Sequence, residues 1–112
     1  MQINIAKDFS DMPGGRLISE GDYSGELFRK ELLLPKYKES LEKGEQLIID
    51  FDGAYGYPPS FLDEAFGGLV RELKVTGILE HIVMIANDDL SVVQRVKNYV
   101  EEAERKIRGT SK

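Results

Sequence analysis

Short apolar runs alternate along the chain with longer stretches in which apolar residues recur at helical spacing. The runs predict strands: residues 2–6 alternate polar and apolar side chains, while 46–51 (QLIIDF) and 81–86 (HIVMIA) are largely apolar. Residues 16–19 are predicted to pair back on the first strand across the turn-rich segment 8–15. The expected sheet therefore opens with a hairpin and continues with two buried strands.

The first helix is predicted to follow the turn EGDYSG and to end at Gly44, because glycine readily adopts the left-handed conformation that closes a helix. Ser24 is its expected N-cap, where a serine oxygen accepts a hydrogen bond from an otherwise unpaired backbone N–H. Pro35 interrupts the pattern and is expected to kink or restart the helix, because proline has no N–H and crowds the preceding turn.

Two further helices are predicted, for residues 61–73 and for 87–109. Gly67 and Gly68 lie within the first of these, where each glycine costs about 1 kcal/mol relative to alanine. Such a pair indicates close packing of the helix on the sheet, or a bend. The last helix is expected to have Asn87 or Asp88 as its N-cap.

The predicted order is β-β-α-β-α-β-α in a single domain, residues 1–112, with 109–112 expected to be disordered. This order indicates an α/β layered fold with a mixed sheet and helices packed mainly on one face. Functional residues of such folds gather where strands end and helices begin. Residues 52–60 and 87–91 are two such junctions and are expected to be neighbours.

Composition narrows the class of protein. With 41% hydrophobic and 31% charged residues among 112, the chain is an ordinary globular domain, and its net charge of −5 disfavours binding to nucleic acid or an anionic membrane. It has no cysteine and a single histidine, His81, so disulfides, zinc sites and a catalytic triad are not expected. No segment has the pattern of a signal peptide or membrane span. A cytoplasmic protein without metal or cofactor is expected.

The stretch GYPPSFLDEAFGG, residues 56–68, joins a buried strand to a helix and contains Ser60. Ser60 to Asp63 has the pattern of a capping box, in which the serine oxygen accepts a backbone N–H and the acid reaches back. Ser60 is therefore expected to be the N-cap of this helix.

Four segments, PGGR, SGELFRKELLLP, IIDFDG and PSFLDEAFGGLV, together resemble the STAS-like family of unknown function. These are small bacterial proteins akin to STAS domains, which have the fold of the anti-sigma factor antagonists. The resemblance extends from Asn4 to about Val100 and is most specific over residues 47–68.

The resemblance implies a role in signalling regulation. In true anti-sigma factor antagonists, a serine or threonine at the start of the helix after the central strand is phosphorylated by a partner kinase, which the unphosphorylated form binds. The matching position is Ser60, so the implied phosphoacceptor is Ser60 and the implied protein partner is a histidine-kinase-like ATPase. The usual Asp-Ser-Ser-Gly motif is replaced by Pro58, Pro59, Ser60 and Phe61, so the acid and the glycine are missing.

A partner surface is predicted around the same junction, because aromatic residues crowd the loop and the helix start and such side chains anchor many protein interfaces. The alternative is that they pack over the edge of the sheet. The predicted surface comprises Tyr55, Tyr57, Phe61, Asp63 and Glu64.

A second candidate site is the segment Gly14, Gly15 and Arg16, where two glycines could turn backbone N–H groups toward a small anion and the arginine adds positive charge. The alternative is a plain turn, because glycine and proline in a loop need no ligand to explain them.

Asp50 and Asp52 form a D-x-D-G motif after an apolar strand, which resembles that of haloacid-dehalogenase-type phosphatases. There, paired carboxylates attack phosphate and hold magnesium, and Asp88 could supply a further metal ligand. The short spacing of the acids, the position of the motif behind other structure, and Ala54 in place of a hydroxyl residue argue against that class.

The sequence thus predicts a non-enzymatic STAS-like interaction module controlled by phosphorylation at Ser60. The alternative is a small phosphate-handling or nucleotide-binding protein that uses Asp50, Asp52 and Asp88 with magnesium.

Overall fold

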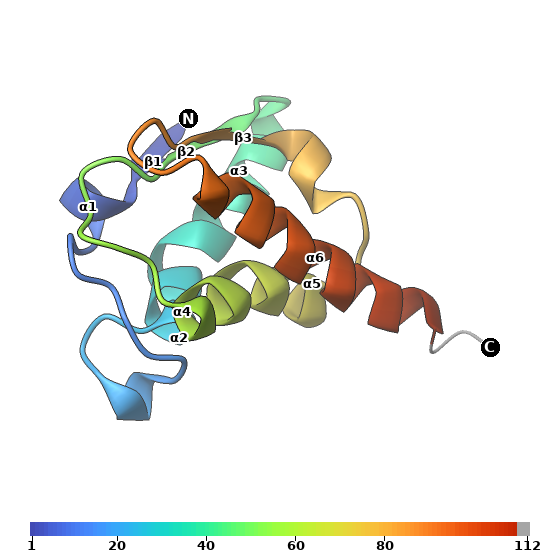
Figure 1. The fold of residues 1–112 in the computed structure, drawn as a ribbon. Coiled ribbons are helices and arrows are strands. Elements are labelled where there is room, and N and C mark those ends of the chain that lie inside the picture. The colour runs from blue at the N-terminus through green and yellow to red at the C-terminus, as the bar shows by residue number, and fades with distance from the viewer. Residues whose placement is uncertain (110–112) are drawn as a thin grey trace.

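The computed structural model of the protein describes residues 1–109 and contains a three-stranded sheet in the order β1-β2-β3 (Figure 1). The strands are β1 (Gln2–Asn4), β2 (Leu47–Asp50) and β3 (Ile82–Ile85). Ile3 lies opposite Ile49, and Ile49 opposite Met84. The two apolar runs that predicted buried strands are confirmed as neighbouring strands, with β2 at the centre.

The predicted initial hairpin is wrong, and the mixed sheet with it, because the described strands all run parallel. Residues 16–19 form no strand. The N–H groups of Arg16 and Leu17 instead donate to the Glu20 carboxylate, at 2.8 and 3.2 Å, and a 3-10 turn, η1 (Ile18–Glu20), follows. The Glu20 carboxylate thus accepts the backbone N–H groups that would have to bond to a neighbouring strand in the predicted hairpin.

The first strand is shorter than predicted because the chain turns helical at Ile5. Helix α1 (Ile5–Asp8) is capped by Asn4, whose side chain accepts a hydrogen bond from the Lys7 N–H at 2.9 Å. Asparagine is among the favoured residues at this position, so the short strand ends where the cap begins.

The first long helix comprises three continuous segments: α2 (Gly25–Phe28), the π-helical η2 (Arg29–Leu33) and α3 (Leu34–Lys43). Its predicted ends are confirmed, since the Ser24 hydroxyl accepts from the Leu27 N–H at 3.1 Å and Gly44 has a φ of 67°. The α-helical pattern restarts at Leu34, with Pro35 in its first turn, as one of the two predicted outcomes. The wider turn before the proline keeps the helix continuous across the missing N–H.

The second long helix comprises α4 (Pro59–Leu62), the π-helical η3 (Asp63–Gly67) and α5 (Gly68–Leu73). It begins at Pro59, earlier than predicted, because Pro58 is extended (φ −60°, ψ 148°) and proline is favoured at the first helical position. The helix ends at Lys74 in a left-handed conformation, and a 3-10 turn, η4 (Ile78–His81), then leads into β3.

The last helix, α6 (Ser91–Gly109), begins later than predicted. The acceptor at its start is Asp89, not Asn87 or Asp88: the Asp89 carboxylate takes the Ser91 N–H at 3.0 Å. Gly109 is helical, which corrects the predicted disorder at that residue, and the remaining residues 110–112 lie outside the described part of the chain. Over residues 1–109, no helix combines the length and the apolar character needed to cross a membrane.

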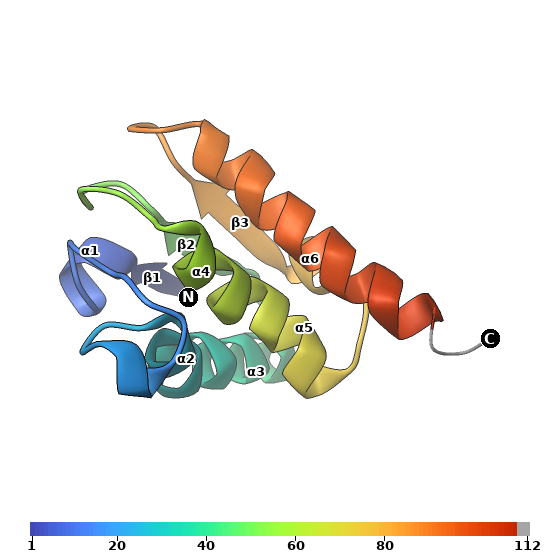
Figure 2. The same ribbon diagram turned by 60° about the horizontal axis from the view of Figure 1, so that its bottom comes forward.

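The long helices cover one face of the sheet, and the core lies between them (Figure 1 and Figure 2). Ile3, Leu47 and Ile49 point into this core and are almost fully buried, whereas Val83, on the opposite face, is 39% exposed. The centre is filled by the aromatic rings of Phe28, Phe51, Phe61 and Phe66.

Candidate functional site

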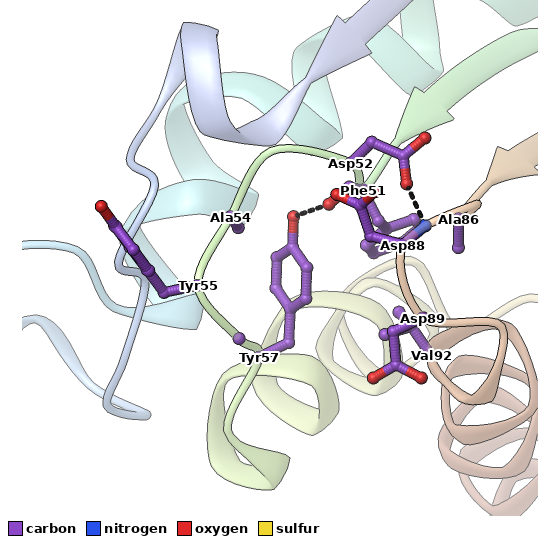
Figure 3. Close-up of a pocket in the computed structure, with 10 residues that line it drawn as sticks. Phe51, Asp52, Ala54, Tyr55, Tyr57, Ala86, Asp88, Asp89 and Val92 are labelled. Carbon is purple, nitrogen blue, oxygen red and sulfur yellow. Dashed lines mark hydrogen bonds between the residues drawn. The ribbon is translucent and has the colours of Figure 1, made fainter.

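The carboxyl ends of β2 and β3 meet at one edge of the sheet, and hydrogen bonds join the loops that follow them (Figure 3). Asp52 Oδ1 accepts from the Asp88 N–H at 2.8 Å, and Asp52 Oδ2 from Asn87 Nδ2 at 3.1 Å. Asp88 Oδ2 in turn accepts from the Gly53 N–H at 3.0 Å. The expected proximity of the two strand–helix junctions is confirmed.

The three aspartates considered for a magnesium site are engaged in hydrogen bonds within these loops and between them. Asp50 Oδ1 accepts from the Asp52 N–H at 2.9 Å, and Asp52 and Asp88 make the bonds between the loops. Among the residues that the structure describes, no group of three or more His, Cys, Asp or Glu side chains is arranged to hold a metal ion. The geometry therefore gives no support to the phosphatase-like alternative.

Tyr57 and Phe61, predicted as part of the partner surface, are buried, so that part of the prediction is wrong. Tyr57 is 7% exposed, and its hydroxyl donates to the Phe51 carbonyl at 2.6 Å (Figure 3). Phe61 is fully buried, with its ring centroid 5.6 Å from that of Phe28. The chain folds back after β2, so these two rings join the core. They are closer to the alternative expectation, in which the aromatic residues of this loop pack against the sheet.

Tyr55, in contrast, is 83% exposed, and its ring points away from Asp52 and Asp88 (Figure 3). Its backbone is fixed, because the Tyr55 N–H donates to the Asp11 carbonyl at 2.8 Å. A groove of about 400 Å³ beside it is lined by Met12, Pro13, Tyr55, Gly56, Tyr57 and Pro58. Tyr55 is therefore an exposed aromatic side chain whose own backbone is fixed by a hydrogen bond.

A pocket of about 300 Å³ lies between the loop after β2 and the start of α6 (Figure 3). It is lined by Phe51, Asp52, Ala54, Tyr55, Gly56, Tyr57, Ala86, Asp88, Asp89 and Val92. Burial, and then the negative charges of Asp50, Asp52 and Asp88, raise the pKa of the Tyr57 hydroxyl above its usual value. The carboxylates at this edge of the sheet thus act electrostatically on Tyr57, a residue that lines the pocket.

Ser60 lies in the first turn of α4 and is not its N-cap. Pro58 occupies the N-cap position and Pro59 the first helical position, so the capping-box prediction is wrong. The prediction placed the start of the helix too late. Proline fits the first helical position, because the N–H that it lacks is unpaired there in any case. Ser60 is partly exposed, and within the described part of the chain its hydroxyl forms no hydrogen bond.

Asp63 and Glu64, predicted as acids of the partner surface, belong to a chain of alternating charges. Asp63 lies 2.8 Å from Arg16 and 3.3 Å from Arg71. Glu64 lies 3.6 Å from Arg16 and 2.9 Å from Arg29. Burial alone would raise the pKa of Asp63, but the two arginines lower it below its usual value. Both carboxylates are thus paired within the chain.

The predicted anion loop of Gly14, Gly15 and Arg16 is wrong for Gly14, whose N–H donates to the Tyr23 carbonyl at 3.0 Å. The Arg16 N–H does turn toward an anion, and that anion is the chain's own Glu20. The Glu20 carboxylate accepts from the Arg16 and Leu17 N–H groups, which lower its pKa. Gly15 has a φ of 88°, which suits glycine. The guanidinium that was expected to attract a ligand is engaged by the acids of η3.

Two arginines that the sequence pattern did not single out bind groups on either side of the candidate loop. Arg29 is 8% exposed, binds Glu72 at 3.0 Å, and lies against Gly68 so closely that a Cβ there would overlap its guanidinium. Gly68, the second of the two mid-helix glycines, was the signal for this residue. Arg95 of α6 donates to the Tyr57 carbonyl at 2.9 Å, and nothing in the sequence indicates that bond.

Residues 24–91, more than half of the chain, match the model of a family described as STAS-like domain of unknown function (DUF4325). The match runs from the N-cap of α2 to the first residue of α6, and so includes β2, β3 and the junctions between them. No curated protein and no solved structure gives a significant match. The match is narrower than the predicted extent from Asn4 to about Val100, and the PGGR segment lies outside it. Over residues 24–91 the resemblance carried by the sequence motifs is confirmed, and the chain belongs to this family of STAS-like domains.

Proposed function

We propose that the protein is a non-enzymatic regulatory module that binds a protein partner through the loop between β2 and α4. The exposed Tyr55 carries this proposal, since the residue is 83% exposed in the loop that follows the central strand. Aromatic side chains supply a large apolar area with few rotatable bonds, and they are frequent anchors of protein interfaces. An interface anchor is the role that fits this position.

The backbone that presents Tyr55 is held along its length. The Gly53 N–H, the Tyr55 N–H and the Tyr57 hydroxyl each donate a hydrogen bond to a neighbouring segment. A partner would therefore need to order little more than the tyrosine side chain, which keeps the entropic cost of binding small.

Exposed apolar residues continue the surface around this tyrosine. Met12 is 67% exposed, and Gly56 and Pro58 are exposed beside the same groove. We name these residues, Met12, Tyr55, Gly56 and Pro58, the Tyr55 surface. Its mixture of a flexible methionine and a rigid aromatic ring suits a protein contact.

Ser60 is proposed as the switch of this surface, and a histidine-kinase-like ATPase as the partner. Ser60 is partly exposed, its hydroxyl forms no hydrogen bond within residues 1–109, and it lies two residues after Pro58. A phosphate adds about −1.5 to −2 charges at neutral pH. It would stand one helical turn from Asp63 and Glu64, where it repels the acids and competes for Arg16. These charges would rearrange beside Pro58, which belongs to the Tyr55 surface. Phosphorylation of Ser60 would control binding in this way.

Site-specific photocrosslinking in the native host tests the partner surface. A photoreactive phenylalanine analogue placed at Tyr55 is expected to yield a discrete adduct with another protein. The matched control places the analogue at Leu41, an apolar residue of α3 that is 43% exposed, and no such adduct is expected there. Failure at Tyr55, or the same adducts from both positions, contradicts the proposal.

The switch is tested by introducing charge into the same assay. Ser60→Asp is expected to weaken the adduct about tenfold, whereas Ser60→Ala leaves it unchanged. Ser19→Asp, which adds the same charge on the exposed turn η1, is the control. Mass spectrometry of the protein from cells should find phosphate on Ser60. If Ser60→Asp behaves like the control and no phosphate is found, the switch is wrong and the partner surface stands.

A further inference from the structure

Residues 55–57 separate two hollows of different character. On one side is the apolar groove of the Tyr55 surface, and on the other the acid-lined pocket of about 300 Å³. The floor of this pocket is buried and is formed by Phe51, Ala86 and Val92. Its rim is more exposed and is formed by Asp52, Asp88 and Asp89. The pocket thus joins an apolar floor to a negative rim.

Two of the rim carboxylates each use a single oxygen in the hydrogen bonds of the fold. Asp88 Oδ2 accepts from Gly53, and Asp89 Oδ1 accepts from the N–H and hydroxyl of Ser91. Within residues 1–109, no donor forms a hydrogen bond to the other oxygen of either side chain. Asp89 Oδ2 forms an ion pair with Arg95 Nη2 at 3.7 Å, a distance too long for a hydrogen bond.

The surroundings leave this rim negatively charged. The start of α6 adds about half a positive charge, and Arg95 adds one, with its Nη1 bonded to the Tyr57 carbonyl. Asp50, Asp52, Asp88 and Asp89 oppose them. The raised pKa of Tyr57 agrees with a negative field at the pocket, although burial is its first cause.

We propose that the pocket receives a basic side chain, arginine or lysine, of the protein that binds the Tyr55 surface; this inference rests on the proposed function. The aliphatic stem of such a side chain would lie on the apolar floor, and its charged end would reach Asp88 and Asp89. The partner segment is thus expected to place a basic residue beside an apolar one, which fills the adjoining groove.

Other occupants fit the pocket less well. A phosphate or nucleotide would meet three carboxylates, and like charges repel at this range. A divalent metal ion would need a set of converging ligands, which the described residues do not offer. A basic side chain satisfies both the charge of the rim and the apolar floor.

Titration of the isotope-labelled protein with N-acetyl-arginine amide, followed by amide NMR shifts, tests the proposal. The matched probe is N-acetyl-citrulline amide, which has nearly the same shape and no charge. The arginine probe is expected to shift the amides of Gly53, Gly56, Asp88 and Asp89, while the citrulline probe does not. Equal shifts with both probes, or shifts elsewhere on the molecule, overturn the proposal.

The double variant Asp88→Asn and Asp89→Asn removes two charges and retains the oxygens that accept from Gly53 and Ser91. It is expected to bind the arginine probe about tenfold more weakly than wild type. Glu101→Gln with Glu102→Gln removes the same charge from an exposed stretch of α6 and is expected to bind normally. Equal weakening by both double variants overturns the proposal in favour of a general charge effect.

The proposal and the function on which it rests can fail separately. A crosslinked partner at Tyr55 whose affinity is unchanged by Asp88→Asn and Asp89→Asn overturns the basic-side-chain pocket and leaves the partner surface intact. Binding of the arginine probe without any adduct at Tyr55 contradicts the proposed function, and the pocket is then a site for a free organic cation.

Discussion

Tyr57 connects the core to the candidate site. Its ring centroid lies 5.3 Å from that of Phe51 and 6.1 Å from that of Phe61. Its hydroxyl donates to the carbonyl of Phe51, the residue directly after β2, and its own carbonyl accepts from Arg95 of α6. This one residue therefore holds the loop on which Tyr55 stands against both a strand and a helix.

Tyr57→Phe is expected to lower the free energy of unfolding by about 1–3 kcal/mol, because the Phe51 carbonyl loses its buried donor. Urea denaturation followed by circular dichroism measures the change. Tyr55→Phe is the matched control, since that side chain lies in solvent, and its effect should stay within about 0.5 kcal/mol. Equal effects of the two substitutions would show that the Tyr57 hydroxyl does not hold the loop.

The raised pKa of Tyr57 predicts a loss of stability in alkali. The folded state favours the neutral hydroxyl, so its contribution is complete below the ordinary tyrosine pKa of about 10 and is lost as the pH rises through the higher folded-state pKa. Urea denaturation at about pH 9 and about pH 11 should therefore show a larger loss for wild type than for Tyr57→Phe. Equal losses in the two proteins contradict the assignment.

Ser60 and the two tyrosines mark the limit of what local sequence can predict about the site. The strand–helix junction was predictable because an apolar run ends at paired aspartates. The cap was not, because one more proline inside the helix moves Ser60 past the capping position. Tyr55 and Tyr57 are alike in composition, and the tertiary path of the loop alone buries one of them and exposes the other.

The two π-helical turns, η2 and η3, pack against each other where the long helices meet. Arg29, the first residue of η2, binds Glu64 of η3 and Glu72 of α5. A helix without a side chain at Gly68 leaves the space in which this guanidinium lies. The mid-helix glycine is therefore explained by helix-on-helix packing around an arginine, and not by packing on the sheet.

Gly68→Ala is expected to destabilise the protein by about 1–3 kcal/mol, because the new Cβ overlaps the Arg29 guanidinium. In an Arg29→Met background the same substitution should become neutral or stabilise by up to about 1 kcal/mol, as helix propensity dictates once the overlap is relieved. Chemical denaturation of the four proteins in this cycle measures the change of sign. A destabilisation of the same size in both backgrounds contradicts the packing account.

Elements that follow from the spacing of apolar residues were predictable. Elements that depend on which acceptor takes a backbone N–H were not. Strands β2 and β3 follow from their apolar runs, and the ends of the first long helix follow from Ser24 and Gly44. The hairpin failed because Glu20 supplies acceptors within the loop itself. Extended-looking residues thus form a strand only if no nearer group takes their backbone donors.

At the scale of the whole molecule, the parallel sheet brings distant segments to one edge. The Asp11 carbonyl, the loop after β2 and the loop after β3 meet there through hydrogen bonds. Parallel strands end at the same side of a sheet, so a surface composed of several loops follows from the topology. The molecule therefore presents Tyr55 and the acidic pocket side by side at one end.

The central claim is that a protein partner binds the Tyr55 surface, and isothermal titration with the crosslinked partner tests it most directly. Tyr55→Ala is expected to weaken binding by about 2 kcal/mol, a factor of about thirty, because an aromatic anchor is removed. Leu41→Ala, at the exposed apolar control position on α3, should bind like wild type. If Tyr55→Ala binds the partner as tightly as wild type, the claim is contradicted.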